Sequence, residues 1–183
     1  MPEFERIRDR DLLKRFRAGD RDAFAEVYRL HSGAVFRFAL HMTADESKAG
    51  ELMQDVFVWL IHHSERWDPD RGEFRHFLIG VARMQLKRRR SEELRWMPLE
   101  ESALWGEARP GSDVAGEDAQ ILRRAILALP DRYREVVVLC ELEERTYEEA
   151  AVIIECSVGT IRSRLHRARA LLARKLTGKG CPV

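Results

Sequence analysis

The sequence predicts an all-α protein made of two small helical domains joined by an acidic, flexible linker. Three observations support this fold class. Apolar residues recur at three- and four-residue steps along most of the chain, which is the spacing of one helix face. Almost no segment alternates apolar and polar residues as a strand would. Between residues 91 and 118, acids, prolines and glycines replace this periodicity, a composition typical of a linker.

Composition and charge favour a folded protein with a basic C-terminal end. The 183 residues are 45% hydrophobic and 34% charged, so a hydrophobic core is expected and disorder throughout is not. The net charge of +1 hides an asymmetry, because no acid occurs between Cys156 and Val183. A basic end of this kind is typical of proteins that bind nucleic acid.

Cysteine usage and the N-terminus predict a cytoplasmic protein. The three cysteines, Cys140, Cys156 and Cys181, form no C-x-x-C pair, and an odd number suits a reducing compartment. The first residues are charged where a secretory signal needs an apolar run. No apolar stretch approaches the length of a transmembrane helix, so no membrane insertion of its own is expected.

Start and stop signals divide the first predicted domain, residues 1–91, into helices. Asp11 can cap a short helix over 12–17, which Gly19 ends. Asp20 is then placed to open a longer helix whose aromatic and β-branched residues face inward.

Two further helices complete this domain. Thr43 and Glu46 have the spacing of a capping box, which predicts a helix running to about His63. After a stretch rich in turn residues, another helix starts near Glu73 and continues into the basic run 87–90.

The helix that ends near His63 has an unusual outer face. One side gathers apolar residues for the core, whereas the other presents Glu51, Gln54, Asp55, Val58 and Ile61. Acids around exposed Val and Ile suit a protein-binding surface with an apolar centre and a charged rim. The alternative, burial of Val58 and Ile61 against the first helix, stays open at this point.

The basic helix also has two interpretations. Cations near a helix C-terminus can simply complement the helix dipole and remain solvated. Four consecutive cations, Lys87 to Arg90, exceed that need, and with Trp67 nearby they suggest a groove for single-stranded or opened DNA.

Residues 146–175 predict a helix-turn-helix. Thr146 and Glu149 form a capping box, the turn falls near Glu155, and Ser157 suits the cap of the second helix. That helix has an apolar stripe on one side and a polar, cationic face on the other, which fits a helix in the major groove. The bland alternative is a basic amphipathic helix with a solvated face.

Three segments of the chain resemble a known family, the extracytoplasmic-function (group IV) sigma factors of the sigma-70 family, which are bacterial RNA polymerase subunits. They are ELMQDVFVWL (51–60), FRHFLIGVARMQLKRRR (74–90) and LPDRYREVVVLCELEERTYEEAAVIIECSVGTIRSRLHRARALL (129–172). The resemblance implies a region 2 domain over 1–91, an acidic linker over 92–116 and a region 4 helix-turn-helix domain over 117–178.

The resemblance also implies a role for each surface. Residues expected to read the −35 element are Thr160, Arg162, Ser163, Arg164, His166 and Arg167. Those expected at the −10 element are Trp67, Arg83, Gln85, Lys87 and Arg88. Those expected to bind core RNA polymerase are Glu51, Gln54, Asp55, Val58 and Ile61.

The implied partners are core RNA polymerase, promoter DNA and an anti-sigma factor. On the polymerase, the contacts would be the clamp helices of the largest subunit and the flap of the second-largest subunit. The implied function is an alternative sigma factor that directs promoter-specific initiation and is held inactive by the anti-sigma factor until a stress signal arrives.

Three positions depart from the family pattern. Gly50 stands where an acid is usual, and Met84 where the −10 segment usually has Asn. Glu155 stands at a turn position that favours glycine, so a strained or reshaped turn is expected there.

Three other functions fit the sequence less well. Glu73 and His76 match half of a helical di-iron pattern, but no second copy exists and no nucleophile or phosphate-binding motif appears, so we predict no enzyme, no cofactor and no metal site. A stand-alone helix-turn-helix regulator would leave residues 51–90 without a role. A sigma-like decoy for an anti-sigma factor should have lost the DNA-facing cations, such as Arg162, which are present.

Overall fold

The computed structural model describes residues 2–96 and 116–177, and in these ranges the regular structure is helical with no strand. The all-α prediction is therefore confirmed. The helices of the first half are α1 (Pro2–Arg17), α2 (Arg21–Thr43), α3 (Glu46–His63) and α4 (Phe74–Trp96), with two 3₁₀ turns, η1 (Ser64–Arg66) and η2 (Pro69–Arg71). Those of the second half are α5 (Glu117–Leu127), α6 (Asp131–Val137), the π-helical turn η4 (Val138–Leu142), α7 (Tyr147–Ile154) and α8 (Val158–Thr177).

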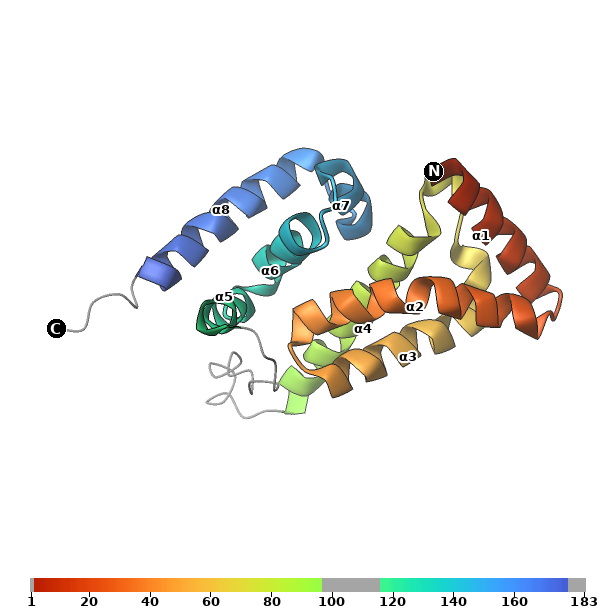
Figure 1. Ribbon diagram of the computed structural model, residues 1–183, viewed down its shortest axis with the longest axis horizontal. Helices are drawn as coiled ribbons and strands as arrows, with labels where there is room; N and C mark the ends of the chain where they lie inside the picture. Colours follow the sequence, from red (N-terminus) through yellow and green to blue (C-terminus); the bar gives the residue numbers. More distant parts are fainter. Residues whose placement is uncertain (1, 97–115, 178–183) are drawn as a thin grey trace.

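The two halves pack side by side (Figure 1). In the first half α2 contacts α1, α3 and α4, and in the second half α8 contacts α5, α6 and α7. Across the boundary α4 contacts α7, and α2 contacts η4. Buried residues of both halves, from Leu60 and Phe74 to Val136 and Ile161, belong to one continuous hydrophobic cluster.

The start of α1 differs from the expectation that Asp11 caps a helix over 12–17. The helix begins at Pro2, so Asp11 lies inside it. The reason is a tertiary contact: Asp9 is buried and one of its carboxylate oxygens lies 3.0 Å from Nε2 of His31 on α2. The predicted end is right, since Gly19 has a φ of +95°. Asp20 caps α2 as expected, accepting hydrogen bonds from the backbone of residues 22 and 23.

The expected capping box of Thr43 and Glu46 is wrong. Thr43 is the last residue of α2, and its hydroxyl donates to the carbonyl of Ala39 at 2.8 Å. Asp45 caps α3 instead, because its carboxylate accepts from the backbone N–H of Lys48 at 3.0 Å. The predicted end of this helix, His63, is confirmed.

The predicted linker falls partly within a helix. α4 continues to Trp96, five residues beyond the expected domain boundary at residue 91. The rest of the acidic segment, 97–115, lies outside the described residues, and the domain boundaries stay a prediction. None of the helices in the described ranges is long and apolar enough to cross a membrane.

The cap of α3 gives the first testable prediction. Asp45→Ala should lower the free energy of unfolding by about 1 kcal/mol, because the first turn of α3 loses its side-chain acceptor. Glu46→Ala is the matched control and should cost only about 0.3 kcal/mol, since it removes an exposed charge near the helix start. Urea denaturation measures both, and an equal loss in the two variants would contradict the assignment of the cap.

Candidate nucleic-acid interface

The sequence of the turn explains how α7 and α8 are held at a fixed angle. Thr146 and Glu149 form the predicted capping box of α7, with reciprocal bonds of 3.2 and 2.7 Å. Glu155 ends α7 in the left-handed conformation, at a φ of 58°, as the departure from glycine suggested. Ser157 then caps α8, because its hydroxyl accepts from the backbone N–H of Thr160 at 3.1 Å.

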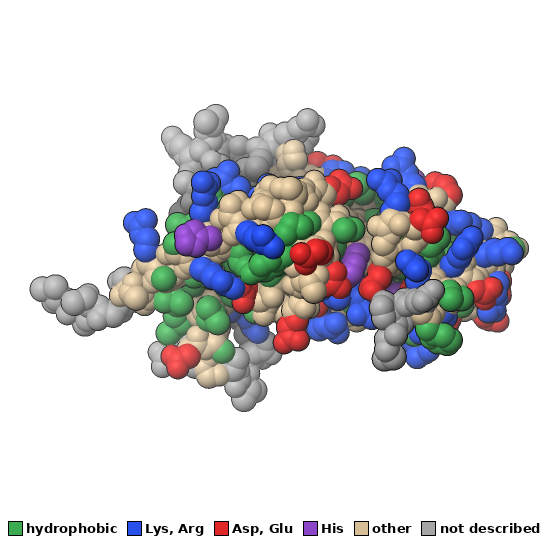
Figure 2. Space-filling view, turned by 90° about the horizontal axis from the view of Figure 1, so that it is seen from above, with side chains coloured by type: hydrophobic (Ala, Val, Ile, Leu, Met, Phe, Trp, Pro, Cys, Tyr) green, Lys and Arg blue, Asp and Glu red, His purple; other side chains and the backbone are tan. Residues whose placement is uncertain are grey.

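The apolar stripe of α8 fixes which side faces solvent. Ile161, Leu165 and Ala168 are buried against the neighbouring helices. The opposite face consists of six residues that are exposed or half-buried: Thr160, Arg162, Ser163, Arg164, His166 and Arg167. Figure 2 shows the whole molecule from above, and Lys and Arg side chains are visible over the half that contains α8 as well as over the other half.

The two arginines that bracket this face lie beside aromatic side chains. The guanidinium carbon of Arg162 is 6.0 Å from the ring centroid of Tyr147 on α7. Arg167 interacts with the hydroxyl of Tyr133 on α6 and lowers the pKa of that phenol. Both contacts orient a cation without neutralising it, so the face keeps positive charge for a phosphate or a base edge.

The outer face of α3 is a second exposed surface. Val58 and Ile61 keep 55% and 46% of their surface exposed, so their burial against the first helix is excluded. Glu51 and Gln54 are exposed beside them, and Asp55 is half-buried. The two acids pair with Arg89 of α4, at 3.5 Å for Glu51 and 2.5 Å for Asp55. An apolar centre with an acidic rim is the anatomy of a protein-binding patch.

The five residues expected at the −10 element do not form one surface in this arrangement. The ring of Trp67 is buried against Phe74, with centroids 5.1 Å apart, and its indole N–H donates to the carbonyl of Gly72. Gln85 is also buried, whereas Lys87 and Arg88 are exposed. Trp67 therefore holds the loop before α4 and does not offer its ring to a DNA strand here.

Cations of α4 face a buried carboxylate from the second half. Arg83 Nε lies 3.1 Å from one oxygen of Glu135 on α6, and Lys87 Nζ lies 3.9 Å from the other. The side chain of Glu135 is only 4% exposed. Next to these, Arg90 pairs with Asp131 at the start of α6. Two of the predicted −10 residues are thus engaged by α6.

Arg134, the neighbour of Glu135, ties α6 to α2. Its guanidinium donates to the carbonyl of Met42 at 3.1 Å and to the carbonyls of Leu127 and Leu129. Burial lowers the pKa of Arg134 to about 10, so it stays charged at neutral pH. Sequence reasoning missed both residues. The local sequence feature that could have pointed to them is a pair of charged residues directly before the apolar run 136–139.

Comparisons with known proteins agree with the two halves. A family model described as sigma-70 region 2 matches residues 27–95, and one described as sigma-70, region 4 matches residues 119–172. The ECF RNA polymerase sigma factor SigM of Bacillus subtilis is 30% identical over 147 residues, which cover 79% of this chain and 89% of that protein.

Two other matches extend this picture. The ECF RNA polymerase sigma factor SigE of Mycolicibacterium smegmatis is 28% identical over 158 residues, 79% of this chain but only 58% of that protein. Among solved structures, the sigma factor RpoE from Bartonella quintana, in complex with the anti-sigma factor NepR, matches with a TM-score of 0.67 and 24% identity, covering 84% of this chain and 96% of that one. At this identity the likeness concerns the fold.

The buried ion pair at the boundary gives the second prediction. Glu135→Gln should favour separation of the halves, because Arg83 loses its counter-ion in a site where its side chain is only 15% exposed. Removing one partner of a buried pair costs about 3 kcal/mol, and opening relieves that cost by returning Arg83 to water. Small-angle scattering should therefore report a larger radius of gyration.

The control for this change is Glu141→Gln. Glu141 pairs with Arg169 within the second half, at 2.5 Å, and its side chain is 40% exposed. It should leave the radius of gyration unchanged, with unaltered helix content in both variants. A compact Glu135→Gln protein would mean that this pair does not hold the halves together.

Proposed function

Because the chain belongs to the extracytoplasmic-function (ECF) sigma factors of bacterial RNA polymerase, we propose that it binds core polymerase through α3 and reads promoters through α8 and α4. It is thus an alternative sigma factor, an initiation factor rather than an enzyme, and acts where the polymerase is, in the cytoplasm. The single observation that carries the assignment of residues is the exposed face of α8, which is cationic and rests on a buried stripe.

The −35 role of α8 follows from the order of its residues. Thr160 and Ser163 are short polar side chains near the helix N-terminus, where a helix in the major groove meets base edges. Arg162, Arg164 and Arg167 project from the same stretch and are long enough for base edges or the flanking phosphates. The retained cations favour a promoter-reading protein over a decoy.

The polymerase role of α3 follows from its exposed centre. Val58 and Ile61 would bury their exposed apolar surface against a partner helix. Glu51, Gln54 and Asp55 would supply polar contacts around them. The clamp helices of the largest subunit are the proposed partner of this face. The flap of the second-largest subunit is the proposed partner of the region 4 half.

Reading of the −10 element requires the halves to separate. In the closed arrangement Arg83 is largely covered, Gln85 is buried, and Glu135 occupies the cations that would bind phosphates. We therefore regard this arrangement as the inactive form of the factor. An anti-sigma factor that binds both halves would stabilise it until a stress signal releases the protein; the Bartonella quintana sigma factor of similar fold was solved in complex with an anti-sigma factor, NepR.

Run-off transcription tests the function and the reading helix together. With sigma-free core polymerase and a cognate promoter, the protein should produce a defined start site. Arg162→Ala should weaken binding to the −35 duplex about tenfold and relax base preference there, because one side-chain contact to the duplex is lost. Arg174→Ala, at the exposed far end of α8, is the control and should keep the base preference. Absence of any sequence-dependent start would reject the function.

A charge reversal tests the polymerase face separately. Asp55→Lys should lower the affinity for core polymerase at least tenfold, since it puts a cation where an acidic rim is needed. The change also breaks the internal pair with Arg89, so Arg89→Ala serves as the control. This control frees the Asp55 carboxylate and should not reduce core binding. Equal affinities of the wild type and Asp55→Lys would discard this contact.

A further inference from the structure

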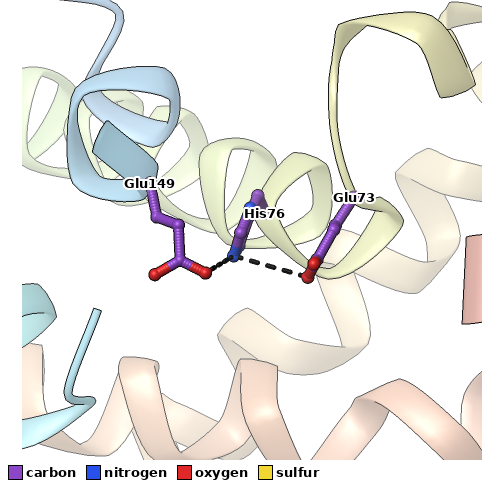
Figure 3. Close-up of side chains that lie close together, drawn as sticks. All are labelled: Glu73, His76 and Glu149. Carbon is purple, nitrogen blue, oxygen red and sulfur yellow. Dashed lines mark ion pairs between the residues drawn. The ribbon is translucent and has the colours of Figure 1, made fainter. Parts of the chain in front are cut away.

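Three potential metal ligands from two different halves meet where α4 contacts α7. Glu73 directly precedes α4, His76 lies in its first turn, and Glu149 lies in the first turn of α7 (Figure 3). One ligand atom from each residue lies within 4.8 Å of the other two. Glu73 and Glu149 are half-buried, and His76 is only 6% exposed.

The imidazole of His76 lies at ion-pair distance from two carboxylates but makes a hydrogen bond to neither (Figure 3). Its Nε2 lies 3.4 Å from Oε1 of Glu149 and 3.7 Å from Oε2 of Glu73. Within the described part of the chain this buried nitrogen has no hydrogen-bond partner. Both separations exceed the roughly 2.7–3.2 Å of a hydrogen bond. A cation held between this nitrogen and the two carboxylates would satisfy all three groups at once.

The carboxylate of Glu149 is already oriented for such a ligand. Its Oε2 accepts the backbone N–H of Thr146 at 2.7 Å in the capping box of α7. This bond fixes the side chain and leaves Oε1 facing His76. Ligands of structural metals are commonly held by an outer hydrogen bond of this kind.

We propose that Glu73, His76 and Glu149 bind one divalent transition-metal ion, with Zn²⁺ the best fit, and that water completes the coordination. One imidazole nitrogen and two carboxylate oxygens are ligands of Zn²⁺, whereas Mg²⁺ and Ca²⁺ prefer oxygen alone. Tetrahedral Zn²⁺ with bonds of about 2.1 Å keeps its ligand atoms roughly 3.4 Å apart. The two separations from His76 Nε2, 3.4 and 3.7 Å, are close to that spacing.

The position of the site links ion binding to the contact between the two halves. Two ligands belong to the first half of the chain and one to the second, so the complete site exists only while α4 and α7 are in contact. An ion that binds the closed arrangement alone stabilises it by mass action. This second step assumes the proposed function. Bound Zn²⁺ would then lower the affinity for promoter DNA, and bound DNA would lower the affinity for Zn²⁺.

Two nearby arginines offer an alternative explanation for the charge balance of this cluster. Arg75 and Arg145 are close enough to act electrostatically on His76, and Arg145 also acts on Glu149. If these guanidiniums alone neutralise the two carboxylates, no ion is needed. The two accounts differ in whether the full chain takes up Zn²⁺ at this site.

Competition with a chromophoric chelator tests the site directly. The full chain, with its cysteines kept reduced, should bind one Zn²⁺ ion per molecule. This ion should bind more tightly than any further Zn²⁺ ion. Glu149→Gln should lower the affinity for that ion at least tenfold. It should preserve the capping box, because Gln can replace Glu at this position. Glu148→Gln, its exposed neighbour on α7, should bind as the wild type does. No stoichiometric uptake, or the same affinity in Glu149→Gln, would overturn the proposal.

Two further measurements keep the outcome decisive. Glu73→Gln changes a half-buried ligand outside the capping box and should show a similar loss of Zn²⁺ affinity with unaltered circular dichroism. Hydrogen exchange with and without Zn²⁺ should show added protection in the first turns of α4 and α7. Unchanged exchange despite binding would discard the link to domain closure. Neither measurement uses polymerase or DNA, so failure here leaves the sigma-factor assignment untouched.

Discussion

One buried carboxylate, that of Glu135, is compensated by cations from the other half of the chain. Glu135 sits on a helix whose next residues are fully apolar, and its side chain is 4% exposed. An ionised carboxylate at this depth is unstable unless a cation faces it. The first half of the chain supplies Arg83 and, farther away, Lys87. The need to compensate this charge therefore favours contact between α6 and the side of α4 that carries Arg83 and Lys87.

The same constraint connects the fold to the function. Arg83 and Lys87, the cations that face Glu135, are two of the residues proposed to contact the −10 element. A carboxylate and a phosphate compete for the same guanidinium, because each can accept two parallel hydrogen bonds from Arg through two of its oxygens. On the proposed function, the acid of α6 would occupy cations that DNA needs, so closure and binding of the −10 element would exclude each other.

Local signals in the sequence predicted the parts of the structure that are locally determined. The caps at Asp20, Thr146 and Ser157, the turn at Glu155 and the buried stripe of α8 all lie where the pattern placed them. The failures have long-range causes. Asp9 extends α1 through its contact with His31, and the burial of Trp67 and Gln85 depends on packing. Glu149 meets His76 across 73 positions, a distance no motif of fixed spacing can span.

Few polar groups at the boundary between the halves are both buried and charged. Besides Arg83 with Glu135 and His76 with Glu149, the boundary has ion pairs in which one partner is well exposed: Lys87 is 52%, Asp131 43% and Arg37 58% exposed. Exposed pairs contribute at most about 1 kcal/mol each. Most of the polar specificity then rests on Glu135 and on Arg134, whose hydrogen bonds reach α2. A boundary with so few decisive groups can be shifted by one competing ligand, whether that ligand is DNA on the cations or a protein across both halves.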